Sequence, residues 1–92
     1  MQIINSNTVL MIKVLFFAQL REQLHTDAID LPFIADESIA ALKQRIVLLH
    51  PEWQAVLQAT QLLASINHDY AKSHSLVPAG AEVGFFPPVT GG

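Results

Sequence analysis

The chain has 92 residues, of which 51% are apolar and only 14% are charged, so it is too hydrophobic for intrinsic disorder and predicts one globular domain. A net charge of −3 and five scattered Lys and Arg residues argue against a nucleic-acid-binding surface. The complete lack of cysteine excludes disulfides, thiolate catalysis and cysteine zinc sites.

The sequence also lacks the signatures of a membrane protein, a secreted protein or a self-sufficient enzyme. Its apolar runs fall short of the roughly 20 residues that span a membrane, and no secretory signal pattern is present, so we expect a cytoplasmic location. The four histidines stand at no metal-ligand spacing, so no metal site is predicted. Nucleophile-elbow, P-loop and dinucleotide-binding motifs do not occur, so we expect no active site and no bound cofactor.

The domain is expected to begin near Met11, which would serve as well as Met1 as a natural start. Residues 1–8 are polar and unpatterned, and residues 1–10 are interpreted as an N-terminal extension. Residues 9–17 are nearly all apolar and predict a central strand. Lys13 must face outward, so Leu15 and Phe17 share its face, and the core-facing residues are Ile12, Val14 and Phe16.

The next segments predict a hairpin partner and a covering helix. Residues 18–25 form a polar connection with room for one helical turn, and residues 26–31 form a short strand closed by Pro32. The run Asp36-Glu37-Ser38 supplies an acidic first turn and an N-cap. Apolar residues then recur at helical spacing, at Ile39, Leu42, Ile46 and Leu49, and we expect Lys43, Gln44 and Arg45 to point toward water.

The second half predicts a short helix and three strands. Pro51 suits a first helical position, and Trp53 is expected to pack in or beside the core. A strand over 62–66, a turn over 67–69 and a brief strand at 70–71 follow, and after a loop a turn at 78–80 leads into a final strand over 81–86. In that strand Glu82, Gly84 and Phe86 face outward, and Val83 and Phe85 face the core.

This order of elements fits an α+β fold of the β-grasp type, a mixed sheet with one main helix packed on one face. The predicted domain covers residues 11–86, and residues 87–92 form a protruding C-terminal tail. Pro87 and Pro88 stop strand pairing and favour an extended course, which would carry the terminus about 15 to 20 Å from the domain. Gly91 and Gly92 have no Cβ, so they fit a narrow channel, and we interpret the Gly92 carboxylate as the working group.

A second expected functional feature is a docking patch beside the tail. If the first and last strands are neighbours, Phe17 and Phe86 share the uncovered face of the sheet, with Tyr70 nearby. Burying one large apolar side chain is worth roughly 1.5 to 3 kcal/mol, so several left exposed together indicate a surface that binds a partner.

Three segments, VLFFAQLRE (14–22), LLASIN (62–67) and EVGFFPPVTGG (82–92), resemble the small subunits of molybdopterin synthase, the MoaD sulfur carriers, and the resemblance covers about residues 11–92. It implies a ubiquitin-like β-grasp fold. It also implies that Gly92 is adenylated and then converted to a thiocarboxylate. The tail that enters the partner would be Pro87, Pro88, Val89, Thr90 and Gly91, and the docking surface would be Phe17, Tyr70 and Phe86.

The resemblance further implies the partners. An ATP-using activating enzyme of the MoeB type would adenylate the terminus, and ATP would be used by that enzyme alone. The large synthase subunit, MoaE, would take the tail into its active site and transfer sulfur to cyclic pyranopterin monophosphate, forming molybdopterin for the molybdenum cofactor. The chain would be the sulfur-donor subunit of an enzyme, commonly a two-plus-two heterotetramer, without an active site of its own.

Three alternatives stay open from the sequence. A sulfur carrier for thiamine synthesis or tRNA thiolation would use the same fold and terminus, although the FFPPVTGG ending favours the pterin pathway. A ubiquitin-like modifier would form an isopeptide bond through the same carboxylate. A pure interaction module would tolerate deletion of Gly91 and Gly92.

Overall fold

The computed structural model describes residues 9–59 and 61–88. Within these ranges the chain forms five strands, three α-helices and one 3-10 turn. In chain order these elements are β1 (Met11–Phe16), α1 (Ala18–Leu24), β2 (Ala28–Pro32), α2 (Ile39–Leu49), η1 (Pro51–Trp53), α3 (Gln54–Ala59), β3 (Leu63–Ile66), β4 (Asp69–Ala71) and β5 (Glu82–Phe86).

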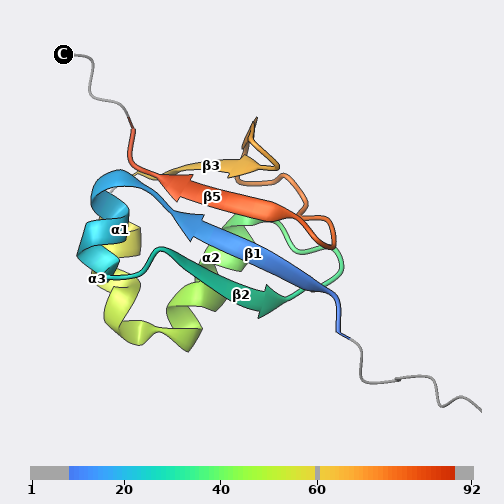
Figure 1. The fold of residues 1–92 in the computed structure, drawn as a ribbon, viewed down its shortest axis with the longest axis horizontal. Coiled ribbons are helices and arrows are strands. Elements are labelled where there is room, and N and C mark those ends of the chain that lie inside the picture. Colours follow the sequence, from blue (N-terminus) through green and yellow to red (C-terminus); the bar gives the residue numbers. More distant parts are fainter. Residues whose placement is uncertain (1–8, 60, 89–92) are drawn as a thin grey trace, which may run out of the picture.

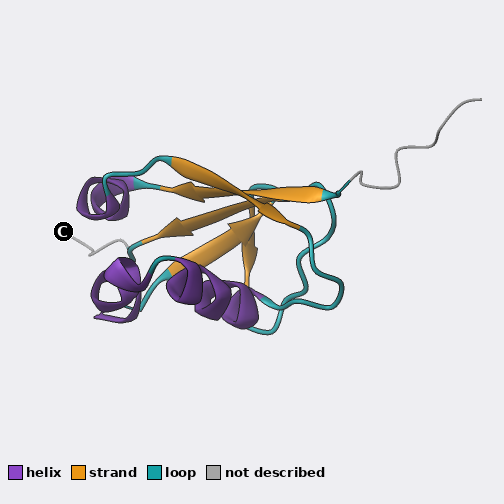
Figure 2. Cartoon of the chain, turned by 90° about the horizontal axis from the view of Figure 1, so that it is seen from below, coloured by secondary structure: helices purple, strands orange, loops and turns teal. Residues whose placement is uncertain are grey.

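The strands form one mixed sheet in the order β2-β1-β5-β3-β4. β1 and β5, the first and last strands, are parallel neighbours at its centre, and the other pairs are antiparallel. Figure 1 looks onto the uncovered face, and Figure 2 shows that α2 lies on the opposite side of the sheet. This is the predicted α+β β-grasp arrangement, with its main helix on one face.

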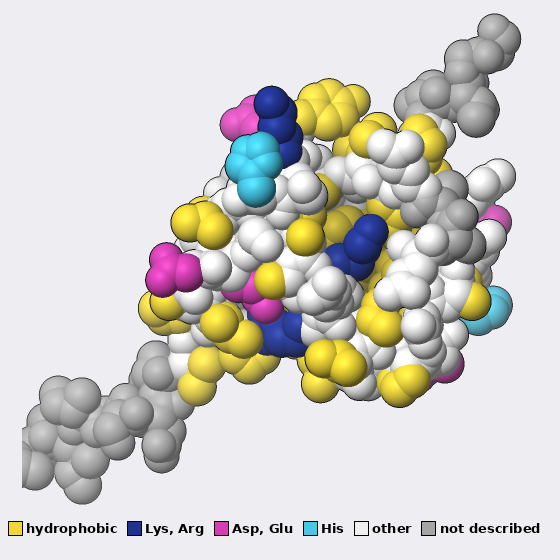
Figure 3. Space-filling view, turned by 180° about the vertical axis from the view of Figure 1, so that it is seen from behind, with side chains coloured by type: hydrophobic (Ala, Val, Ile, Leu, Met, Phe, Trp, Pro, Cys, Tyr) yellow, Lys and Arg dark blue, Asp and Glu magenta, His cyan; other side chains and the backbone are white. Residues whose placement is uncertain are grey.

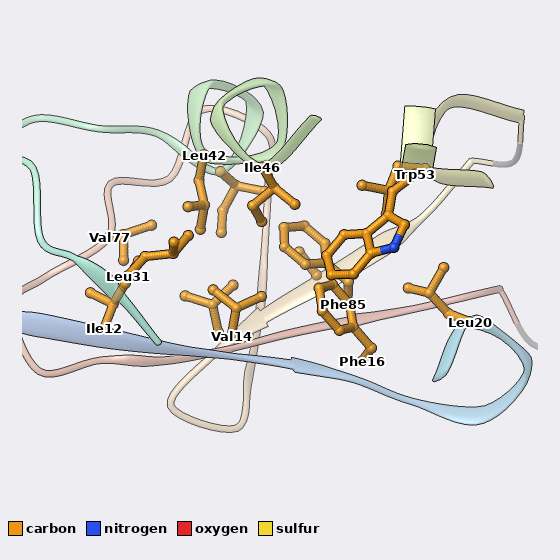
Figure 4. Packing of buried hydrophobic residues seen from close by; sticks show 14 of the residues in the cluster. Ile12, Val14, Phe16, Leu20, Leu31, Leu42, Ile46, Trp53, Val77 and Phe85 are labelled. Atoms are coloured by element: carbon orange, nitrogen blue, oxygen red, sulfur yellow. The ribbon is translucent and has the colours of Figure 1, made fainter. Parts of the chain in front are cut away.

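The core lies between this helix layer and the sheet. Figure 4 shows Leu42 and Ile46 of α2 and Trp53 of η1 directed toward the sheet residues Val14 and Phe85. All five are buried. The Trp53 and Phe16 rings form a T-shaped pair with 5.5 Å between centroids, and Trp53 also stacks on His50 at 4.0 Å. The prediction that Trp53 is a core residue is therefore confirmed.

The predicted alternation along the two central strands is confirmed. Ile12, Val14 and Phe16 are at most 2% exposed, as are Val83 and Phe85. One charged residue in each strand was enough to identify the outer face, because side chains on a strand alternate strictly. β1 is shorter than the expected 9–17, since it ends at Phe16.

The helix α2 confirms its predicted N-cap but corrects two of its side chains. Ser38 Oγ accepts a hydrogen bond from the Ala41 N–H at 3.1 Å. Leu49, expected on the buried face, is 54% exposed, because the helix ends there and Trp53 covers this end of the core instead. Arg45 was expected in water, but its guanidinium donates hydrogen bonds of 2.9 and 2.8 Å to the buried Glu37 carboxylate.

The connection expected over 18–25 is a helix of seven residues. α1 buries Leu20 and Leu24, whose spacing of four residues places both on one side of the helix. It ends at His25, which adopts the left-handed conformation with φ 54°. The left-handed residue after α1 lets the chain turn toward β2, and Leu20 and Leu24 extend the core at this end of the sheet.

The predicted boundary at Met11 stays a prediction, because residues 1–8 lie outside the described residues. The Leu10 carbonyl accepts a hydrogen bond of 2.8 Å from the Phe33 N–H, so contact with the domain reaches at least that far. The parallel pairing of β1 and β5 sends the two ends of the described chain out at opposite ends of the sheet (Figure 1).

Candidate functional site

The uncovered face of the sheet changes from charged to uncharged along its central strands. Lys13 of β1 stands in register with Asp30 of β2 and Glu82 of β5, and its Nζ lies 3.6 Å from the Asp30 carboxylate. Two residues further along, Leu15 stands opposite Gly84. Because outward residues recur every second position, the charged row is followed by an uncharged row nearer the C-terminal end of β5.

A hollow of about 360 Å³ opens on this uncharged half. Ser65 of β3, which stands opposite Gly84 of β5 on one side and opposite Tyr70 of β4 on the other, contributes to its lining. The lining side chains come from three separate segments of the chain, namely the residue after β1, the β3–β4 hairpin and the end of β5. They are Phe17, Ser65, His68, Tyr70 and Phe86.

Phe17 rests on the sheet because Gly84 has no side chain. A Cβ at Gly84 would stand 2.8 Å from Phe17 Cε2 and 2.7 Å from Ser65 Oγ, closer than carbon contacts allow. An alanine at this position would have to displace both side chains, so the lack of a Cβ lets the aromatic ring lie close to the backbone. The Phe17 ring is still 43% exposed, so its outer part remains available for contact.

The aromatic side chains around the hollow contact one another but stay open to solvent. The Tyr70 and Phe86 rings are 5.9 Å apart between centroids, tilted at 53°. Tyr70 is 80% exposed, although its ring is large, and Phe86 is half-buried. The structure thus brings together the three residues expected to form the docking surface, and the docking role itself stays a prediction.

The predicted tail begins directly beside the hollow. Phe86, the last residue of β5, contributes to the hollow and is followed by the half-buried Pro87 and the exposed Pro88. Neither proline has an N–H group, so strand pairing cannot continue through them. The remaining predicted tail residues, Val89, Thr90, Gly91 and Gly92, lie outside the described residues.

Sequence reasoning missed the contributions of Ser65, His68 and Gly84 to this site. The outward orientation of Gly84 followed from the alternation, but its role under Phe17 depends on the register between strands far apart in sequence. His68 was predicted only as part of a turn. Its position at the hollow follows from the β3–β4 hairpin lying next to β5.

The rest of the described surface has a second hollow, but neither a group of metal ligands nor a membrane-spanning helix. This second hollow, of about 380 Å³, opens between α2 and β3, and Lys43 is part of its lining. Figure 3 shows this helix-covered side of the molecule, with basic side chains among hydrophobic ones. In residues 9–59 and 61–88 no three His, Cys, Asp or Glu residues are grouped as metal ligands would be. None of the helices described has the length and apolar character to cross a membrane.

Comparison with known proteins adds evidence on the family. Residues 14–92 match the ThiS family. The chain is 43% identical over 83 residues to the molybdopterin synthase sulfur carrier subunit of Escherichia coli strain K12, and the match covers 89% of this chain and 100% of that protein. The protein of the same name from Haemophilus influenzae is 40% identical over 84 residues, with the same two coverages of 89% and 100%.

Solved structures agree on the architecture. The crystal structure of the H. volcanii small archaeal modifier protein 1 aligns with a TM-score of 0.72 at 19% identity, covering 87% of this chain and 99% of that chain. The solution structure of the modifier protein of the same name from Methanosarcina acetivorans aligns with a TM-score of 0.66 at 22% identity, covering 94% and 100%. At these identities the likeness shows a shared fold.

Proposed function

The chain belongs to the ThiS family, and from this premise we propose that it is the sulfur-carrier subunit of a molybdopterin synthase, acting in molybdenum cofactor biosynthesis. The observation that carries the proposal is the identity of 40 to 43% to two sulfur carrier subunits over their entire lengths. The hydrophobic hollow at the root of the tail supports it, because a carrier must present its terminus to another protein.

In this proposal the reacting group is the carboxylate of Gly92. A carboxylate is a poor acyl electrophile, because direct substitution would have to expel an oxide ion. Attack of its oxygen on the α-phosphorus of ATP releases pyrophosphate and gives an acyl-adenylate. A sulfur nucleophile then displaces AMP and leaves a thiocarboxylate. The carrier needs no cysteine for this chemistry, in agreement with its composition.

The partners of the proposal divide the work. A MoeB-like activating enzyme binds ATP and performs the adenylation, and a MoaE-like large subunit accepts the tail, Pro87 to Gly91, and supplies the catalytic side chains. The surface around Phe17, Tyr70 and Phe86 docks on these proteins. Its apolar character and its closeness to Pro87 support this assignment, because docking there directs the terminus into the partner. The cytoplasmic location stays a prediction from the sequence.

Intact-mass analysis tests the proposal. After incubation with ATP, the activating enzyme and a sulfur donor, the chain should gain the mass difference between one sulfur and one oxygen atom. The modified chain should then convert cyclic pyranopterin monophosphate to molybdopterin in the presence of the large subunit. A matched control lacks Gly92 and should show neither change while unfolding at the same temperature. Molybdopterin formation by this truncated chain would contradict the proposal.

Two further measurements separate the alternatives that use this terminus. Lysine-linked conjugates recovered from cells would identify a protein modifier. Sulfur transfer to a thiamine precursor or to tRNA, with none to the pterin, would identify a different sulfur carrier. Both outcomes are readable from the mass of the product.

A further inference from the structure

The hairpin between β3 and β4 contains an unusual residue beside the hollow. Ile66 pairs with Asp69, so the loop consists of only Asn67 and His68, and their φ angles are 50° and 74°. Positive φ at both positions of a two-residue hairpin loop is the signature of a type I′ turn. Glycine is strongly preferred at its second position, because a side chain there is sterically disfavoured. His68 occupies that position.

The hydrogen bonds of the turn explain Asn67. Its side-chain Oδ1 accepts a hydrogen bond of 2.9 Å from the Glu82 N–H, and its own N–H donates one of 2.8 Å to the Glu82 carbonyl. Asn67 thus fastens the hairpin to β5, and asparagine tolerates the left-handed region better than most residues. The turn therefore already has a residue that stabilises it.

The His68 ring contributes much less to the stability of the fold than the Asn67 side chain. Its side chain is 86% exposed, and its Nε2 lies 3.4 Å from Glu82 Oε1, a contact between two solvent-accessible groups that adds little stability. Yet the same side chain lines the hollow together with Phe17, Tyr70 and Phe86. A side chain that adds little to the fold and yet lines a candidate site is available for contact with a partner.

We infer that His68 is a recognition residue for the large synthase subunit, placed by the strained turn at the polar edge of the docking surface; this inference rests on the proposed function. The chemistry of the edge indicates the group that it contacts. The ring nitrogen Nε2 of His68 lies 3.4 Å from Glu82 Oε1, so the imidazole and the carboxylate form one polar cluster at this edge. Glu82, which lies on the same face of the sheet as Phe86, adds negative charge beside it. The matching group on the partner is an N–H donor, most favourably a cationic one.

Three variants of the full-length chain test this inference. His68→Gly relieves the turn and removes the ring, and His68→Asn removes the ring but keeps a residue that restrains the turn. His25→Gly is the matched control, because His25 is also an exposed histidine with positive φ, at the opposite end of α1 from Phe17. Each variant is measured by thermal unfolding and by calorimetric titration with the large subunit from the same organism.

We expect both His68 variants to unfold at the wild-type temperature or above it, with His68→Gly higher by about 4 °C, and to bind the large subunit about tenfold more weakly. His25→Gly should bind like the wild type. Unchanged binding by either His68 variant, or a lower unfolding temperature for His68→Gly, would overturn the inference. Failure of the wild-type chain to bind would instead contradict the proposed function, so the two failures are distinguishable.

Discussion

Tyr70 offers the sharpest test of the docking surface, because the fold hardly uses it. It is 80% exposed and lies on the short strand β4, where its ring contacts Phe86. An aromatic side chain presents about 150 to 250 Å² in total, so docking can cover about 120 to 200 Å² of Tyr70. At about 25 cal/mol per Å² this area corresponds to about 3 to 5 kcal/mol.

Only part of that free energy reaches the measured affinity, because association also costs rotational freedom and side-chain entropy. We therefore expect Tyr70→Ala to weaken binding of the large subunit by about 2 kcal/mol, which is roughly 30-fold in Kd. Its free energy of unfolding should change by less than about 0.5 kcal/mol, as for exposed substitutions in general.

Leu48 provides a control with the same exposed fraction. It is also 80% exposed but lies on α2, on the helix-covered side of the sheet. Leu48→Ala should leave both Kd and stability close to wild type. Calorimetric titration with the large subunit and urea unfolding measure the two quantities. Equal effects of Tyr70→Ala and Leu48→Ala on Kd would refute the docking surface, because exposed apolar area alone would then explain the result.

Three further predictions address other parts of the structure. Phe86→Asp should weaken partner binding in calorimetry by more than it lowers the unfolding temperature, and a collapsed fold with no specific binding loss would assign the ring to the core. Gly84→Ala should push Phe17 off the sheet, costing about 1 kcal/mol of stability in urea unfolding but a larger loss of affinity. Arg45→Ala leaves the 7%-exposed Glu37 carboxylate without its partner and should cost about 3 kcal/mol in urea unfolding, whereas Glu37→Leu combined with Arg45→Met should recover most of it.

Local patterns predicted the fold well, because each relied on short-range physics. Lys13 and Glu82 fixed the outer face of β1 and β5, and Ser38 fixed the start of α2. The same patterns failed where tertiary contacts decide the outcome. Leu49 follows the apolar spacing of α2, yet the core at that end is filled by Trp53, which arrives from the next turn.

Side-chain pairs that depend on how a loop folds cannot be predicted from local sequence patterns. Arg45 and Glu37 are eight residues apart, and the pairing of their side chains depends on how the loop before α2 folds back. Over 18–25 the polar composition indicates a connection, whereas the spacing of four residues between Leu20 and Leu24 indicates the buried helix face that the structure has.

The candidate site was only partly predictable for the same reason. Phe17 and Phe86 are predicted on one face, because side chains alternate along each strand and the β-grasp order makes the first and last strands neighbours. The closeness of Gly84 to Ser65 and Phe17 depends on an exact register between β3 and β5. The position of His68 depends on the conformation of a two-residue loop, which sequence patterns describe only as a turn.

The parallel pairing of β1 with β5 also determines how the domain responds to mechanical force. These strands are the first and last of the fold and lie side by side, so tension between the two ends of the chain pulls them in opposite directions along their length. The backbone hydrogen bonds between them are then loaded together in shear and cannot open one at a time. Tension between the two ends therefore meets more resistance than a force that separates the two strands one hydrogen bond at a time.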